Sequence, residues 1–391
     1  MAAETARKFE ALEAQAQSLM GTFIAAGYEA VAPAIIQPAG IYLDAIGEGL
    51  RARTYVFSDP DGDELCLRPD ITVPVCRLHL ERTNGSDREA RYCYNGAAFR
   101  FQPQGASQSH PREFRQAGIE SIGAAEPNAA DAETLIAIVR ALENAGLTDY
   151  WLRFGDLGLF DAMLKTVEMP ERWRQRLKHH FWRPDAFRAE VKRLATAPGE
   201  LMKGIPDDLV AALDPADPAS SEKAVQAHLD ANGTEVMGAR SVAEITANLI
   251  ARAADARAEP LSAKAAELIE GYLAVNAPAR EAGARIKDVV RAEGVDISDA
   301  LIAFQRRLGF IADAGVDLSR AEFSAEFGRV FEYYTGFVFE VVVPSLGAAT
   351  PVAGGGRYDQ LMKIVGAAHD IPAVGAAIHT ERLLAVIGGG A

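Results

Sequence analysis

The chain has 391 residues, about the length of two or three ordinary domains, and it can bury a core without disulfide bonds or structural metal ions. Hydrophobic residues make up 49% of it and charged residues 24%, which excludes a disordered or fibrous protein. The 40 Lys and Arg residues are outnumbered by 54 Asp and Glu residues, and the net charge of −14 disfavours a broad nucleic-acid-binding surface.

Signals for secretion, membrane insertion and metal binding are weak throughout the sequence. The N-terminal residues are charged, and no apolar run approaches the roughly 18 residues that a membrane span needs. The three cysteines form no disulfide framework, which suits a reducing cytosol. Cys76 and His79 have a metal-like spacing but no second pair, so we expect them to pack in the core. We therefore expect a cytoplasmic protein that contacts no membrane and carries no metal ion or cofactor.

The first part of the chain alternates between helical and strand-like patterns. Apolar residues from Phe9 to Phe23 share one helical face, and Gly27 follows as a stop signal. Strand-like segments and a second helix follow at 28–37, 54–69 (a hairpin with its turn at 59–62), 91–101 and 131–147.

From residue 158 to 312 the pattern changes. Alanine dominates, β-branched runs vanish and prolines separate short helical patterns, which is typical of an all-helical insertion. Strand signals return after residue 335 and end in a helix over 380–387. We predict an α+β fold with a mixed, mainly antiparallel sheet flanked by helices, its core built from residues 1–157 and 313–391 around the insertion.

Four groups of residues with chemical potential lie in the strand-rich parts. Each alone is more often a salt bridge or a turn than a site. Together they could form an amino-acid pocket, in which Asp70 and Glu120 hold an ammonium group, Arg100 a carboxylate or phosphate, and tyrosines a ring. The groups are LRPDIT at 67–72, YNGAAFR at 94–100 with REFRQAGIE at 112–120, RVFEYYTG at 329–336, and GGGRYD at 354–359 with GAAIHTER at 375–382.

In this order the motifs resemble the catalytic domain of class II aminoacyl-tRNA synthetases, and within that class the histidyl enzymes. Pro33 falls where the first, dimer-forming motif of that class has its proline. The segments 94–100 and 112–120 resemble the second motif, and 375–382 resembles the third. The RPDIT, FEYYTG and GGGRYD segments are similar to histidine-specific signatures. The resemblance covers about 1–155 and 315–391, and histidyl enzymes also carry a helical insertion between these parts.

The sequence departs from active synthetases at three points. Only nine residues follow Arg382, which leaves no room for the anticodon-binding domain that follows the third motif in histidyl enzymes. Gln102 stands where active enzymes have the glutamate that contacts the adenine amino group. His379 stands where they have a glycine close to the base, so we expect its imidazole to exclude ATP.

The resemblance implies a surviving histidine pocket. Asp70, Thr72, Gln116 and Glu120 match the positions around the amine, although Asp70 is one methylene shorter than the usual glutamate. Arg100 matches a carboxylate or phosphate contact. Arg329 precedes the Tyr-Tyr pair by four residues as in the family, and Tyr333 and Tyr334 match the side-chain end. The alternative is an inherited pocket without a ligand.

A histidine pocket without adenylation chemistry or a tRNA-binding module is similar to the synthetase-like regulatory subunits of ATP phosphoribosyltransferase. This resemblance implies a non-catalytic protein that activates the short-form catalytic subunit in the first step of histidine biosynthesis. It also implies feedback by free histidine and a dimer within a hetero-oligomer, with no nucleic acid bound. Two alternatives stay open: a truncated, amino-acid-activating ligase, and a tRNA-binding or signalling module.

The segment 171–193 is locally basic, with eight Lys or Arg residues against three acids, and contains Trp173, Phe181 and Trp182. Such a composition can bind RNA. We prefer an amphipathic helix pair that buries its aromatic side chains, with the arginine stems lying along the apolar surface.

Overall fold

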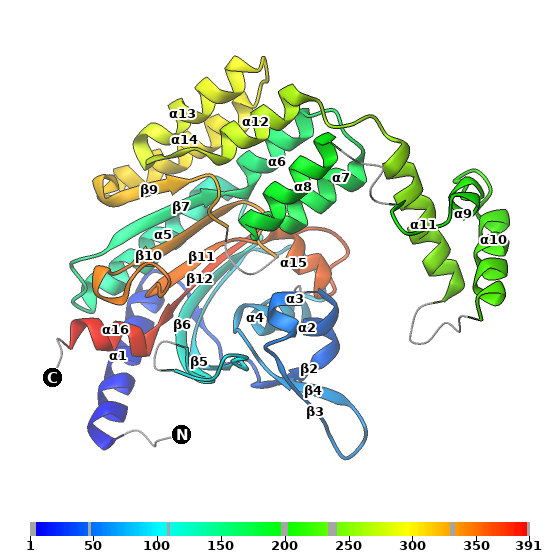
Figure 1. Cartoon of the computed structure of the whole chain (residues 1–391). Coiled ribbons are helices and arrows are strands. Elements are labelled where there is room, and N and C mark those ends of the chain that lie inside the picture. The colour runs from blue at the N-terminus through cyan, green and yellow to red at the C-terminus, as the bar shows by residue number, and fades with distance from the viewer. Residues whose placement is uncertain are drawn as a thin grey trace. The chain divides into compact units, whose positions relative to one another are not determined.

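A nine-stranded mixed sheet dominates the larger part of the computed structural model (Figure 1). The structure describes residues 5–45, 48–107, 110–196, 202–233, 241–328 and 333–388. The chain divides into two compact units, the first built from residues 1–163 and 272–391 and the second from 164–271.

The strands of the large sheet come from both halves of the first unit. Strands β10 to β12, from the C-terminal part, lie between β6 and β7, so the sheet resumes after the insertion as the sequence predicts. The pairs β1–β5 and β7–β9 are parallel, and the other neighbouring strands are antiparallel. In spatial order the strands are β1 (Glu29–Ala30), β5 (Ala90–Phe99), β6 (Glu113–Ile122), β12 (Ala373–His379), β11 (Ala353–Arg357), β10 (Phe337–Val342), β7 (Trp151–Asp156), β9 (Ala321–Ser324) and β8 (Asn276–Pro278).

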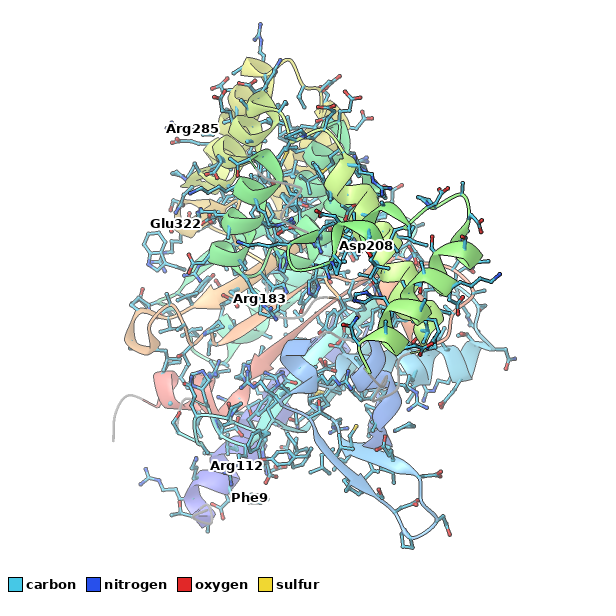
Figure 2. The ribbon with its side chains drawn as sticks, turned by 45° about the vertical axis from the view of Figure 1, so that its right-hand side comes forward. Phe9, Arg112, Arg183, Asp208, Arg285 and Glu322 are labelled. Carbon is cyan, nitrogen blue, oxygen red and sulfur yellow. The ribbon has the colours of Figure 1, made fainter. Side chains whose placement is uncertain are left out.

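Long helices pack against the sheet and against one another. Helix α1 contacts β5 and β6, α5 contacts β11 and β12, and α14 packs on α5. Leu12, Leu19 and Phe23 of the predicted apolar face of α1 are buried and Met20 is partly buried, whereas Phe9 at the start of the helix is 48% exposed (Figure 2). These helices are α1 (Ala6–Ala25), α5 (Pro127–Asn144), α13 (Ala279–Ala292), α14 (Ser298–Asp313) and α16 (Thr380–Ile387).

A second group of short elements forms one hydrophobic cluster with β5. Tyr42 of α2, Cys76 of α4 and Leu361 of α15 are fully buried in it together with Tyr94. The predicted hairpin is present, with β3 and β4 antiparallel across the turn. The elements are α2 (Ala39–Ala45), α3 (Glu48–Arg51), α4 (Thr72–Thr83), α15 (Asp359–Ile364) and the three-stranded sheet of β2 (Ile36–Pro38), β4 (Glu64–Leu67) and β3 (Tyr55–Ser58).

The second unit is helical in its described residues, as the insertion was expected to be. Trp173 and Phe181 are at most 5% exposed and Trp182 is partly buried, in agreement with the preferred interpretation of the basic segment as helices that bury aromatic side chains. Arg183 lies between α7 and α8, and Asp208 lies on α9 (Figure 2). The helices are α7 (Glu171–His180), α8 (Pro184–Thr196), α9 (Asp207–Ala211), α10 (Pro218–Ala231) and α11 (Val242–Arg257), while α6 (Leu157–Thr166) and α12 (Ala263–Leu273) span the boundaries between the units.

The compact second unit is shorter than the insertion of residues 158–312 expected from composition. Residues 272–312 belong to the first unit. Strand β8 extends the large sheet, and α14 packs on α5, which places a charged side chain, Arg307, in the interior. Alanine-rich helices occur on both sides of this boundary, so composition alone does not locate it.

Candidate functional site

Glu120 is the most completely enclosed carboxylate of the predicted site. It lies on β6 and is 0% exposed. The Thr72 hydroxyl, at the start of α4, donates to its Oε1 atom at 2.7 Å, and the Tyr94 hydroxyl donates to the same atom at 3.0 Å. The Tyr358 hydroxyl, just after β11, donates to Oε2. Three hydroxyl groups from three different elements therefore fix this carboxylate.

Burial changes the acidity of Glu120. Removal from water raises the pKa of its carboxyl group to about 7, although the three hydroxyl donors oppose the rise. A carboxyl group with this pKa changes charge near neutral pH. A ligand that brings a positive charge or an N–H donor would favour the ionised form.

Two glycines make space for these polar groups. A Cβ atom at Gly118, on the same face of β6 as Glu120, would lie 2.5 Å from the Tyr94 hydroxyl. A Cβ atom at Gly375, which is opposite Glu120 on β12, would overlap the Oε2 atom of that residue. Because neither glycine has a side chain, the Glu120 carboxylate and the Tyr94 hydroxyl can lie directly against the backbone of the sheet.

Asp70 is a second buried carboxylate, 3% exposed, just before α4. Its Oδ1 atom accepts from the backbone N–H of Val73 at 3.1 Å. Its Oδ2 atom has no hydrogen-bond partner among the described residues. Burial raises the pKa of Asp70 to about 6, against the opposing effects of the Val73 N–H, Arg100 and Arg68. A buried carboxylate oxygen without a partner is costly, so this atom is suited to receive a cationic group.

An open pocket of about 400 Å³ begins beside Arg100. The Arg100 Nε atom donates to the Pro69 carbonyl at 2.9 Å, and its guanidinium lies 4.8 Å from the centre of the Phe114 ring. The His379 ring lies 5.2 Å from the Phe114 ring on the same pocket wall. Arg382 also lines this pocket, and its Nη1 atom donates to the carbonyl of Pro351 at 2.7 Å.

Gln102 is engaged within the same pocket. Its Oε1 atom accepts from Arg53 Nη2 at 2.6 Å, and its Nε2 atom donates to the Pro111 carbonyl at 3.0 Å. Both ends of the amide therefore hold protein groups. The side chain joins the segment after β5 to the loop that leads into β6.

The structure brings most of the predicted site residues together. Thr72 and Glu120 are in contact, and Asp70 lies two residues before Thr72. Arg100 borders the neighbouring pocket. Gln116 is 6% exposed, lies on the same strand face as Glu120 and pairs in register with His379.

The predicted tyrosine pair adjoins the same carboxylate through a third ring. The Tyr333 ring lies 5.9 Å from the Tyr358 ring and 4.8 Å from the Tyr334 ring. Arg329 lies outside the described residues, so its predicted role stays a prediction.

Two residues that hold Glu120 were not among the predicted site residues, although both occur in the motifs. Tyr94 alternates with Tyr92 along β5, and Tyr358 follows the glycine triplet. The alternation shows that Tyr94 faces the same side as Tyr92 but not which atom its hydroxyl meets. That contact depends on the register between β5 and β6, which sets Tyr94 opposite Gly118.

The cysteine–histidine pair belongs to the core, as expected. Cys76 and His79 are both 0% exposed, and His79 Nδ1 lies 3.2 Å from the Tyr92 hydroxyl. Within the described ranges, no group of three or more His, Cys, Asp or Glu side chains could hold a metal ion. None of the described helices has the length and apolar character needed to cross a bilayer.

Comparison with known sequences points to one group of proteins. A family model described as histidyl-tRNA synthetase matches residues 4–268 and 252–383. A protein of Allorhizobium ampelinum called ATP phosphoribosyltransferase regulatory subunit is 36% identical over 376 residues, covering 94% of this chain and 96% of its own. A protein of the same name from Chelativorans sp. is 34% identical over 357 residues, covering 91% and 92%.

The solved structures that share this fold include a regulatory subunit/histidyl-tRNA synthetase and a histidyl-tRNA synthetase. The ATP phosphoribosyltransferase regulatory subunit/histidyl-tRNA synthetase of Bacillus halodurans aligns with a TM-score of 0.69 at 20% identity, over 100% of this chain and 82% of its own. The histidyl-tRNA synthetase of Nostoc sp. aligns with a TM-score of 0.61 at 14% identity, over 97% and 72%. These similarities confirm the predicted class II synthetase-like fold.

Proposed function

We propose that this chain, which belongs to the family of ATP phosphoribosyltransferase regulatory subunits, is a non-catalytic, cytoplasmic histidine sensor. In this proposal it activates a short-form catalytic subunit in the first step of histidine biosynthesis and transmits feedback by histidine. The observation that carries it is the pair of buried carboxylates, Asp70 and Glu120, the first of which has an oxygen without a hydrogen-bond partner among the described residues.

The two carboxylates suit the two ends of a histidine molecule. The Oδ2 atom of Asp70, which no described residue contacts by a hydrogen bond, would hold the ammonium group. The sequence motifs assign Glu120 to the amine, but its hydrogen bonds to the Tyr94 and Tyr358 hydroxyls lead us to propose instead that it accepts from a ring N–H at the aromatic end. Arg100, which donates to the carbonyl of Pro69 next to Asp70, would pair with the ligand carboxylate.

The remaining predicted residues have complementary roles in this proposal. The rings of Tyr333 and Tyr334 would pack against the imidazole. Thr72 would hold Glu120, and Gln116 would complete the polar wall near the amine. Arg329 is proposed as a histidine-binding residue on the strength of the sequence motif alone.

The proposal that the chain is non-catalytic rests on contacts in the open pocket beside Arg100. The His379 ring packs beside Phe114, where a bound purine base would otherwise lie next to the backbone of β12. The Gln102 amide already bonds to Arg53 and the Pro111 carbonyl. These contacts support exclusion of the nucleotide that amino-acid activation requires.

Self-association as a dimer is proposed through one face of the small sheet. The register places Ile36, Leu67 and Tyr55 in one row across this face, and Pro38, Leu65 and Phe57 in the next. Ile36 is 51% exposed and Phe57 is 38% exposed, so an apolar surface faces outward. The carbonyl of Pro33, the residue of the dimer-forming motif, accepts from Arg68 Nη1 at 2.6 Å and is thereby tied to this sheet.

Regulation then follows from linkage. If histidine binds one conformation of the hetero-oligomer better than another, it shifts their equilibrium by the difference in binding free energy. The catalytic subunit responds without sharing a ligand with this chain.

Two measurements test the function. Co-expressed with a short-form ATP phosphoribosyltransferase catalytic chain, the protein should co-purify with it, raise its activity, and make that activity sensitive to histidine. Alone, it should show no histidine-dependent exchange between ATP and pyrophosphate. Robust exchange would establish an amino-acid-activating ligase instead, and failure to bind or activate the catalytic chain would refute the regulatory role.

The pH dependence of histidine binding should report the two carboxyl groups. Because the pKa values of Asp70 and Glu120 are raised to about 6 and about 7 and the ligand favours their ionised forms, binding should release protons in this range. The affinity should fall about tenfold or more between pH 7 and pH 5. Calorimetry in two buffers with different ionisation enthalpies measures both effects. Asp70→Asn should remove the contribution of one carboxyl group and leave a shallower profile set by Glu120, and an affinity that rises on acidification would contradict the assignment.

A further inference from the structure

Arg307 lies at the centre of a buried ionic network behind the predicted pocket. It is a residue of α14 and is 6% exposed. Its Nε atom donates to Asp131 Oδ2 at 2.9 Å, its Nη1 atom to Asp156 Oδ2 at 2.7 Å, and its Nη2 atom to Asn128 Oδ1 at 3.2 Å. The guanidinium also lies 4.7 Å from the centre of the Phe337 ring. One side chain thus connects α14 to α5 and to the end of β7.

The first arm of the network leads to Tyr358. Asp131 forms a second ion pair, with Arg357 Nη2 at 2.7 Å, and Arg357 Nη1 donates to Asp359 Oδ1 at 2.8 Å. Arg357 ends β11, and successive side chains of an extended segment point to opposite sides. The arginine is therefore anchored on the side of α5, while the next residue donates its hydroxyl to Glu120 on the other side.

The second arm leads to the tyrosine pair. Asp156 ends β7, and the backbone N–H of the following residue, Leu157, donates to the Gly336 carbonyl at 3.0 Å. Gly336 lies two residues after Tyr334. Both arms therefore end at the aromatic side of the predicted pocket.

The opposite end of the pocket is held by different groups. Asp70 accepts from the Val73 N–H and is influenced by Arg100 and Arg68, and none of these side chains takes part in the contacts of Arg307. The network and the ammonium-binding carboxylate are thus separate parts of the structure.

We infer that Arg307 is a positioning residue for the effector pocket, which holds Tyr358 and the Tyr333–Tyr334 pair in place for the ligand ring without touching the ligand. The inference rests on the proposed histidine-binding function. It requires an arginine, because three donors of one planar group reach three acceptors on two elements, whereas a lysine ammonium cannot span them.

The test uses two neighbouring arginines of α14 in the full-length chain. Arg307→Lys should weaken histidine binding about tenfold, as measured by calorimetry. The positive charge stays, but the planar guanidinium that reaches three acceptors is lost. Arg306→Lys is the matched control, since Arg306 is 59% exposed and its nearest acidic partner, Glu126, is 3.9 Å away. The control should bind histidine within about twofold of the wild type.

Double variants distinguish positioning from a general structural effect. Combined with Tyr358→Phe, Arg307→Lys should cause a smaller further loss than it causes alone, because the hydroxyl contact with Glu120 is already gone and only the arm to the tyrosine pair remains. Combined with Asp70→Asn, the two losses should multiply. Multiplicative losses with Tyr358→Phe, or equal affinity of the Arg307→Lys and Arg306→Lys proteins, would overturn the inference.

Folding and function are controlled separately. Far-ultraviolet circular dichroism establishes that each variant is folded. If Arg307→Lys is not folded, Asn128→Ala removes only the 3.2 Å contact and should still lower the affinity about twofold to threefold, and an unchanged affinity would overturn the inference. Absence of binding by the wild type would refute the proposed function together with the inference, whereas binding by the wild type with unaffected variants would refute the inference alone.

Discussion

Glu120→Gln should weaken histidine binding about a hundredfold, because hydrogen bonds to a charged partner contribute about 1.5–3 kcal/mol. The carboxylate is fully buried and accepts from Thr72, Tyr94 and Tyr358. A glutamine has the same shape, but its NH₂ group is a donor. It would face hydroxyl groups that donate hydrogen bonds to the carboxylate in the wild type. The amide also lacks the negative charge that would favour a ring N–H. Isothermal calorimetry with free histidine measures the loss.

The matched control for this change is Glu113→Gln. Glu113 is the first residue of the same strand and is exposed, so the same chemical change there should leave the affinity within about twofold. If the Glu120→Gln protein binds histidine as tightly as the wild type, the ring does not meet this carboxylate and the pocket assignment is wrong. Equal losses in both variants would indicate a general electrostatic effect.

Asp131→Ala should lower the free energy of unfolding by about 3–5 kcal/mol, because it leaves two arginines buried without their shared partner. Asp131 is 0% exposed and pairs with Arg307 at 2.9 Å and with Arg357 at 2.7 Å. Burial raises the pKa of this carboxyl group, and the two arginines oppose the rise. Urea denaturation followed by circular dichroism measures the change.

Glu133→Ala provides the comparison on the same helix. The Glu133 side chain is 50% exposed and pairs with Arg91 at the surface, so its removal should cost less than about 1 kcal/mol. A loss of similar size in both variants would show that the buried network contributes no more than an ordinary surface pair.

Much of the fold could be predicted because local patterns and long-range packing agree. The turn residues at 59–62 predict the hairpin of β3 and β4, and the return of strand signals after residue 335 predicts the resumed sheet. The boundary of the insertion could not be predicted. It depends on contacts such as that between Arg307 and Asp131, which are 176 residues apart, and no local pattern encodes such a pairing.

The candidate site was predictable in its carboxylates but not in its hydrogen bonds. The motifs identify Asp70 and Glu120, and the structure places both in the interior. The motifs do not reveal that Tyr94 and Tyr358 donate hydrogen bonds to Glu120. Such contacts depend on strand register and on the direction that the chain takes after β11. Nor does the sequence predict that Asp70 Oδ2 lacks a hydrogen-bond partner within the described part of the chain, which arises from the burial of the turn before α4.

The bare surface at Gly375 has a genetic consequence. Every single-base missense change of a glycine codon introduces a Cβ atom, and here that atom would collide with the carboxylate of Glu120 and approach the Ile119 carbonyl to 2.7 Å. Even alanine at this position would displace the Glu120 carboxylate, so no substitution of Gly375 weakens the pocket only slightly. On the proposed function, a selection for resistance to a toxic histidine analogue should therefore recover substitutions at this codon.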